Sequence, residues 1–234
     1  MATYINKSSK IKKLNKQLEN EFESICSVSA KQQAEYFNSI ITEMCNTPFV
    51  IDCMLKLKKY DEATYLHSLR VGLYCMLIGY IMKLDNEFIK ELGTAGLLHD
   101  IGKKFIPKEI INKQGKLDNL EMNVIQAHVA NSTFYIKQKY NFKNENILLG
   151  VYQHHERLDG SGYPRHLISE EISVPGRIIA IADVLEAYSS KRSYHEGRTI
   201  KQTMKFLNKA EGLDKNIISK LSKQIDLTIE KVVI

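Results

Sequence analysis

Apolar side chains recur along this 234-residue chain with a period of about 3.6 residues, which is typical of α-helices that bury one face. Ile11, Leu14 and Leu18 show this spacing in an otherwise polar stretch, so residues 1–25 are predicted to form an exposed amphipathic helix. No convincing run alternates between apolar and polar residues, as the strands of a half-buried sheet would. The pattern therefore predicts an all-α fold, a bundle of about nine or ten helices with essentially no sheet.

Turn and capping residues divide the rest of the chain into further helices. Asp118 and Glu121 have the spacing of a capping box, which predicts a helix that begins there and holds His128 in its middle. Gly102 fits the glycine that follows the last turn of a helix. Residues 1–55 are expected to form a helical extension without a recognisable sensor domain, packed on the core or on a second copy of the chain. The other helices are predicted at residues 30–45, 48–58, 61–83, 86–100, shortly after Pro107, 118–139, 144–157, 175–190, and as two within 199–234.

Composition and charge narrow the class of protein. The formal charge of +6 suits an anionic substrate, or simple solubility, and no dense basic tract indicates polymeric nucleic acid. No apolar signal segment follows Met1, and the longest mainly apolar run, residues 71–82, is too short to span a membrane. The four cysteines form no C-x-x-C pair, so they are interpreted as reduced thiols of a cytoplasmic protein.

The candidate chemistry lies in five of the seven histidines and in two aspartates. Each residue alone is weak evidence for a functional site, because single histidines are common on helix ends and in cores. Asp100 follows an apolar run, and Asp183 lies inside another. An unpaired carboxylate in such surroundings is costly, and a bound cation would remove this cost. Imidazole and carboxylate together suit a transition metal, and this number of ligands fits two ions that share a bridging carboxylate. The candidate ligands are His67, His99, Asp100, His128, His154, His155 and Asp183.

The order of these residues carries a family resemblance. His99-Asp100, with His67 upstream and Asp183 downstream, resembles the HD phosphohydrolase superfamily. The additional His128, the His154-His155 pair and Gly162-Tyr163-Pro164 resemble the HD-GYP subfamily, which are phosphodiesterases of cyclic di-GMP. The resemblance covers about residues 55–212, and it implies an HD-GYP catalytic domain over residues 56–234 after the extension of residues 1–55.

The resemblance implies a role for each matching residue. The seven ligands would hold two divalent metal ions, which are iron or manganese in family members, with Asp100 as the bridging and catalytic carboxylate. Lys103 would be catalytic and would contact the scissile phosphate. Gly162, Tyr163 and Arg192 would bind the cyclic dinucleotide.

Three positions depart from the family pattern, and one of them, Val129 where proline is common, is a tolerable helix residue. Some members have a glutamate one helical turn before the first histidine, and it supports a third metal. This chain has Ala63 there, which has no ligand atom, so two metals are expected. The family is usually basic where this chain has His195, which leaves one substrate contact open.

The function that the resemblance implies is metal-dependent hydrolysis of cyclic di-GMP to linear pGpG, and further to GMP, in bacterial second-messenger signalling. Two alternatives stay open: a phosphodiesterase for another cyclic dinucleotide, and a non-catalytic signalling protein that binds cyclic dinucleotides. The complete set of ligands argues against the second alternative. A homodimer and signalling-protein partners are not decided by the sequence.

Overall fold

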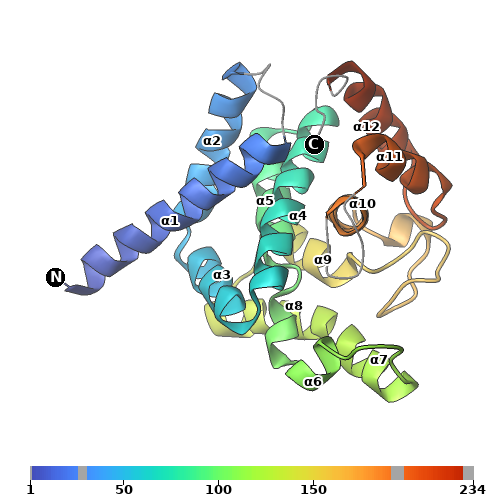
Figure 1. Ribbon diagram of the computed structural model, residues 1–234, viewed down its shortest axis with the longest axis horizontal. Helices are drawn as coiled ribbons and strands as arrows, with labels where there is room; N and C mark the ends of the chain where they lie inside the picture. The colour runs from blue at the N-terminus through green and yellow to red at the C-terminus, as the bar shows by residue number, and fades with distance from the viewer. Residues whose placement is uncertain (1, 26–30, 191–197, 229–234) are drawn as a thin grey trace.

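The computed structural model describes residues 2–25, 31–190 and 198–228, and within these ranges the fold is a bundle of helices (Figure 1). The described ranges contain no β-strand, only one isolated antiparallel bridge between Asp159 and Ile168. The all-α prediction is therefore confirmed. The elements are α1 (Ala2–Ile25), α2 (Lys31–Asn46), α3 (Pro48–Tyr60), α4 (Glu62–Ile81), α5 (Asn86–Leu98), the 3-10 helix η1 (Ile101–Phe105), α6 (Lys108–Ile111), α7 (Asn119–Gln126), α8 (His128–Tyr140), α9 (Glu145–Gln153), η2 (Ser169–Glu171), α10 (Val174–Ser189), α11 (Ile200–Lys209) and α12 (Lys215–Thr228).

Short polar side chains fix where many of these helices begin. Asp61 accepts a hydrogen bond from the backbone N–H of Thr64 at the start of α4, and Asp118 and Glu121 form the predicted capping box of α7. Each such cap satisfies backbone donors that the first helical turn leaves unpaired, and contributes about 1 kcal/mol. Equivalent side-chain caps at the starts of α5, α9 and α10 come from Asp85, Asn144 and Ser173.

The helix predicted over residues 118–139 is wrong in one respect, because it breaks at Ala127 into α7 and α8. His128 is the first residue of α8 rather than the middle of a long helix. Its ring nitrogen Nδ1 hydrogen-bonds the carbonyl of Ile125, so the turn at the break has a side-chain partner. With this split, the described ranges contain twelve α-helices, above the predicted nine or ten.

Gly102 does not end a helix as predicted. It lies inside η1 and is buried against the first turn of α8. A Cβ atom at this position would lie 2.1 Å from the carbonyl oxygen of His128 and 2.5 Å from the backbone nitrogen of Ser132. The glycine is therefore required by the close approach of two backbone segments, and this contact brings η1 next to His128.

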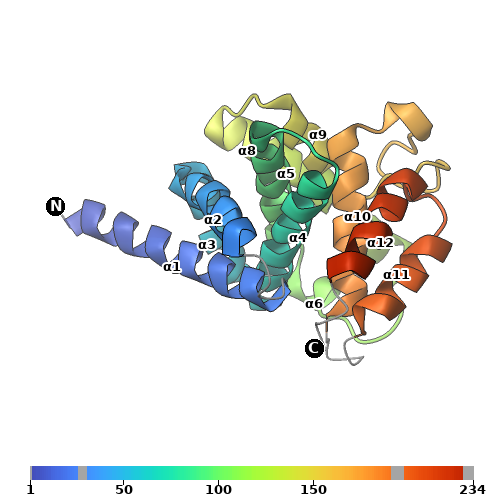
Figure 2. The ribbon, with the colours of Figure 1, turned by 90° about the horizontal axis from the view of Figure 1, so that it is seen from above.

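One continuous hydrophobic core includes the N-terminal helices. Leu14 and Leu18 of α1 and Phe37 of α2 are buried in the same cluster as Leu69 of α4 and Leu98 of α5. Figures 1 and 2 show α4 and α5 at the centre of the bundle, with α1 crossing it and its first turns projecting beyond the other helices. The extension therefore packs on the core, as one of its two predicted roles requires, while the division at residue 55 stays a prediction.

None of the described helices combines the length and the apolar character that crossing a membrane requires. Cys45, Cys53 and Cys75 are buried free thiols, and Cys26 lies outside the described residues. Burial raises the pKa of Cys45 to about 12 and that of Cys53 to about 11, so both stay protonated near neutral pH.

Candidate metal centre

Three histidines enter the centre of the bundle from the ends of three helices. His99 caps α5, His128 follows α7 and His154 caps α9. In each, ring nitrogen Nδ1 hydrogen-bonds the carbonyl three residues earlier, a group that the last turn of a helix leaves unpaired. Donation from Nδ1 fixes the ring orientation and leaves Nε2 with a lone pair. The acceptors are Gly96 O (2.7 Å), Ile125 O (2.6 Å) and Val151 O (2.8 Å) respectively.

Two further helices, α4 and α10, supply candidate ligands. α4 supplies His67 and α10 supplies Asp183, and His67 Nε2 lies 3.1 Å from Asp183 Oδ1. The second oxygen of Asp183 lies 4.0 Å from Nδ1 of His155. Asp183 therefore lies between His67 and His155, with one carboxylate oxygen toward each ring.

Asp100 lies at the middle of the arrangement and is fully buried. Its Oδ2 lies 3.2 Å from His99 Nε2 and accepts a hydrogen bond of 2.6 Å from Lys103 Nζ. Its Oδ1 lies 3.2 Å from Nε2 of His128. The two carboxylate oxygens thus face different histidines, which is the arrangement that a bridging carboxylate needs.

Six of the seven predicted ligands form two neighbouring groups, and the seventh, Asp183, lies between His67 and His155. One consists of His67, His99 and Asp100, and the other of His128, His154 and His155; within each, the ligand atoms lie within 4.8 Å of one another. Asp100 and Asp183 connect the groups through the contacts described above.

Whether these residues suit cations can be tested on His128 and His154, whose Nε2 atoms face each other at 3.3 Å. Both rings donate from Nδ1, so neither Nε2 of a neutral ring has a hydrogen to share. Burial lowers the pKa of His128 to about 4, and burial and the neighbouring His155 lower that of His154 well below its ordinary value. Two facing lone pairs repel each other unless a cation accepts both. These two Nε2 atoms therefore suit a metal ion.

Asp100 supports the same conclusion. Burial alone would raise the pKa of Asp100, but the nearby His99 and Lys103 outweigh it and hold the pKa well below its usual range. The group is therefore a buried carboxylate near neutral pH, and among the described residues its Oδ1 atom has no hydrogen-bond donor. A buried anionic oxygen beside imidazole lone pairs is costly without a cation.

The loop after α9 lies against the histidine pair. The ring of Tyr163 stacks on the ring of His155, with centroids 4.6 Å apart and an interplanar angle of 27°. A Cβ atom on Gly162 would lie 2.4 Å from both His155 O and Arg157 N, so only glycine permits this contact. Buried Glu156 accepts hydrogen bonds from the backbone N–H groups of Arg165 (2.7 Å) and Leu167 (3.0 Å) and ties the far side of the loop to the helix end.

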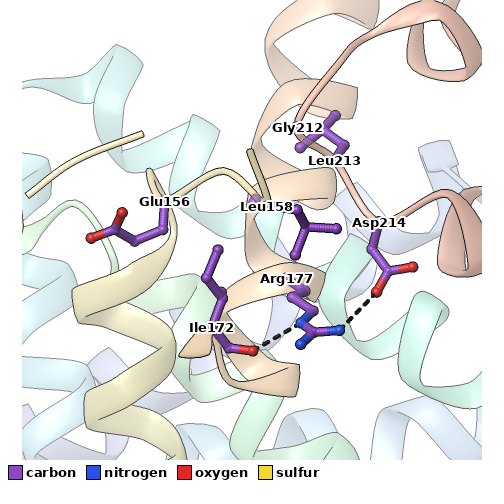
Figure 3. A pocket seen from close by; sticks show the side chains of 8 residues that line it. Glu156, Leu158, Ile172, Arg177, Gly212, Leu213 and Asp214 are labelled. Atoms are coloured by element: carbon purple, nitrogen blue, oxygen red, sulfur yellow. Dashed lines mark hydrogen bonds and ion pairs between the residues drawn. The ribbon is translucent and has the colours of Figure 1, made fainter. Parts of the chain in front are cut away.

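A small pocket lies behind this loop, between it and the segment before α12 (Figure 3). Arg177 of α10 donates to the carbonyl of Ile172 (2.8 Å) and forms an ion pair with Asp214 (3.3 Å). None of the candidate metal ligands lines this pocket. Its polar contacts join the loop to α10 and α12. The lining residues are Glu156, Leu158, Ile172, Arg177, Ala180, Gly212, Leu213 and Asp214.

Comparison with known families shows which family the chain belongs to. A family model described as an HD domain matches residues 53–217, well over half of the chain.

The chain belongs to the HD domain family.

Curated relatives of this HD domain confirm the resemblance to cyclic di-GMP phosphodiesterases. The cyclic di-GMP phosphodiesterase PA4108 of Pseudomonas aeruginosa is 33% identical over 172 residues, which cover 73% of this chain and 41% of the relative. The 3'3'-cGAMP-specific phosphodiesterase 1 of Vibrio cholerae is 39% identical over 147 residues, covering 63% of this chain and 34% of the relative. The HD domain described here thus spans less than half the length of each of these relatives.

Solved structures show the same fold at lower sequence identity. Bd1817, an HDG"Y"P protein from Bdellovibrio bacteriovorus, superimposes with a TM-score of 0.58 at 14% identity, covering 91% of this chain and 70% of that one. The HD domain of the phosphodiesterase PgpH from L. monocytogenes, solved in complex with cyclic-di-AMP, superimposes with a TM-score of 0.52 at 15% identity, covering 78% and 100%. These likenesses establish the helical HD fold.

Some predicted site residues are not part of the described centre. Arg192 and His195 lie outside the described residues. Ala63 lies on α4 one turn before His67, is exposed, and has no side-chain ligand atom. Gly162 is buried against the end of α9, so its visible role is to hold the loop close to His155.

Two residues of the centre were missed by sequence reasoning. Ser132 accepts a hydrogen bond from Gly102 N (2.8 Å) and donates one to His99 O (2.7 Å), which ties η1 to α8. Glu186 contacts His67 Nδ1 from α10. Its position three residues after Asp183, on the same helix face, was the available signal.

Proposed function

We propose that this HD domain is a phosphodiesterase that hydrolyses a cyclic dinucleotide with the help of two divalent metal ions, iron or manganese. The observation that carries the proposal is the position of Asp100, whose two oxygens face the histidines of two separate groups. The curated relatives support the substrate class, because their names specify cyclic di-GMP and 3'3'-cGAMP phosphodiesterases.

The candidate ligands would hold two separate ions. His67 and His99 would hold one ion and His128, His154 and His155 the other, with Asp100 and Asp183 between them. When bound, such ions supply Lewis-acid chemistry, polarising phosphoryl oxygens and acidifying water at neutral pH.

Besides the metal ions, the side chain of Lys103 would place a positive charge at the centre. Its Nζ atom lies 2.6 Å from Asp100 Oδ2, while 23% of its side chain stays exposed. A cation at the edge of the centre meets the negative charge that builds on the phosphate during hydrolysis. We assign Lys103 this role.

Tyr163 is assigned to binding a base of the substrate. Its ring stacks on His155 at the edge of the centre and is only partly buried. Aromatic faces bind nucleobases by stacking, which tolerates different bases. We propose that Gly162 holds this ring in place and that Arg192 contacts a phosphate.

For the substrate itself we propose cyclic di-GMP, with linear pGpG as the first product and GMP as the product of a second cut. The second candidate is 3'3'-cGAMP, which is favoured by the 39% identity to a phosphodiesterase specific for it. The reduced, buried Cys45, Cys53 and Cys75 fit the cytoplasm, which is where we place the protein.

A turnover assay tests this function. Protein loaded with Mn²⁺ is incubated with cyclic di-GMP, 3'3'-cGAMP or cyclic di-AMP, and products are separated by chromatography. We expect cyclic di-GMP to be converted to pGpG, and no conversion after treatment with a chelator. Binding of all three nucleotides with cleavage of none would overturn the enzymatic proposal in favour of a receptor.

The metal content is a separate prediction. We expect elemental analysis of the loaded protein to give about two ions per chain, because Ala63 offers no ligand where some members have the glutamate that supports a third. Three tightly held ions at full occupancy would contradict this and would require a ligand from elsewhere in the chain.

A further inference from the structure

His67 is held differently from the three histidines at helix ends. It lies inside α4, where the carbonyls of the preceding turn are occupied by the helix's own hydrogen bonds. Its Nδ1 atom therefore needs an acceptor from another element. The described contacts provide one, the carboxylate of Glu186 on α10, which meets Nδ1 directly.

Other described residues hold Glu186 in place. Its side chain is only 2% exposed, and it accepts a hydrogen bond of 2.7 Å from Ser190 Oγ and one of 3.4 Å from Arg70 Nη1. Arg70 is fixed in turn by Glu21 of α1, whose Oε2 atom lies 2.8 Å from Arg70 Nε. A buried carboxylate with such partners points in one direction, as a residue that orients another must.

The carboxylate also differs chemically from a backbone carbonyl. An anionic acceptor on Nδ1–H increases the electron density of the imidazole ring and makes Nε2 a stronger ligand. His67 Nε2 lies 3.1 Å from Asp183 Oδ1 and 3.6 Å from Asp100 Oδ2, so the orientation of its ring sets its approach to both carboxylates.

We propose that Glu186 is a positioning residue that fixes His67 and strengthens its binding to metal, with Arg70 and Ser190 holding the carboxylate. The proposal rests on the proposed metal centre, and it assigns to Glu186 no contact with substrate. The same pairing of a carboxylate with a ligating histidine commonly changes metal affinity by about 10- to 100-fold.

The test is metal affinity rather than turnover. Metal-free wild type, Glu186→Gln and Glu186→Ala are titrated with Mn²⁺ and followed by calorimetry. We expect binding weakened by about 10- to 100-fold in Glu186→Ala. A smaller loss is expected in Glu186→Gln, because the amide oxygen can still accept from Nδ1 but lacks the charge.

Glu91→Gln is the matched control. Glu91 also joins two helices, accepting hydrogen bonds from Asn144 and Asn146 of the α9 region, but it touches no candidate ligand. We expect its Mn²⁺ affinity to equal that of wild type. Melting curves of the chelator-treated variants identify any that are unfolded, and the nearly isosteric Glu186→Gln keeps the test valid if Glu186→Ala does not fold.

The outcomes separate the two proposals. If wild type binds Mn²⁺ tightly and both folded Glu186 variants bind it equally well, the positioning role is overturned. If wild type binds no Mn²⁺, the proposed metal centre itself fails. A loss in Glu91→Gln as large as in Glu186→Ala would show a general effect of helix contacts and would also overturn the specific role.

Discussion

Asp100→Ala is expected to abolish hydrolysis of cyclic dinucleotides and to remove most of the bound metal. The variant deletes both oxygens that face the two ligand groups, so two cations would repel each other without an anion between them. The fold is expected to survive, because the core of this bundle consists of apolar contacts far more extensive than those of a small zinc module. Elemental analysis and steady-state kinetics on the purified variant measure both effects.

Asp85→Ala is a suitable control for Asp100→Ala. Asp85 caps the start of α5, whereas Asp100 follows its end. Loss of the cap costs about 1 kcal/mol of stability but should leave metal content and turnover unchanged. If Asp100→Ala kept its metals and most of its activity, the assignment of the centre would be wrong.

Lys103→Ala is expected to lower kcat by about 10²- to 10³-fold while metal content stays near that of wild type. The ammonium group approaches Asp100 from the partly exposed edge, while His99 and His128 are oriented by hydrogen bonds to backbone carbonyls that do not involve Lys103. In the proposed function, its loss removes the positive charge assigned to stabilising the transition state. Steady-state kinetics on cyclic di-GMP and elemental analysis distinguish this result from that of Asp100→Ala.

The neighbouring lysine provides the control for this prediction. Lys104 lies over the rings of Tyr135 (4.3 Å) and Phe105 (4.8 Å), away from Asp100. Lys104→Ala removes the same charge one residue along the chain and should change kcat little. If Lys103→Ala hydrolysed cyclic di-GMP as fast as wild type, Lys103 would only be a solubilising charge at the end of a helix.

The helices were predictable because their signals are local. The period of apolar residues and the caps at Asp61 and Asp118 lie within a few residues of the boundaries they set. The break at Ala127 was not predictable in this way. At this break the chain turns so that His128 points toward the other candidate ligands. That direction depends on helices distant in sequence.

The clustering of the candidate ligands was predictable for a different reason. Five histidines and two buried acids in a familiar order are rare enough to identify a site before its geometry is known. Glu186 was missed although it lies three residues after Asp183, because its contact with His67 exists only where α10 packs against α4. Gly102 was misread because its requirement comes from α8, which local sequence does not reveal.

The three contacts from Nδ1 to a carbonyl at the helix ends prepare the candidate centre for divalent ions without selecting one of them. His99, His128 and His154 lose their rotational freedom when the helices form, before any ion arrives. Little conformational entropy is then left to lose on binding, and this rigidity favours divalent ions in general. Intrinsic affinity should follow the order common to imidazole sites, in which Zn²⁺ exceeds Fe²⁺ and Mn²⁺. The ion found in cells should accordingly report the cell's metal supply, and the same protein made in a zinc-rich medium should contain zinc.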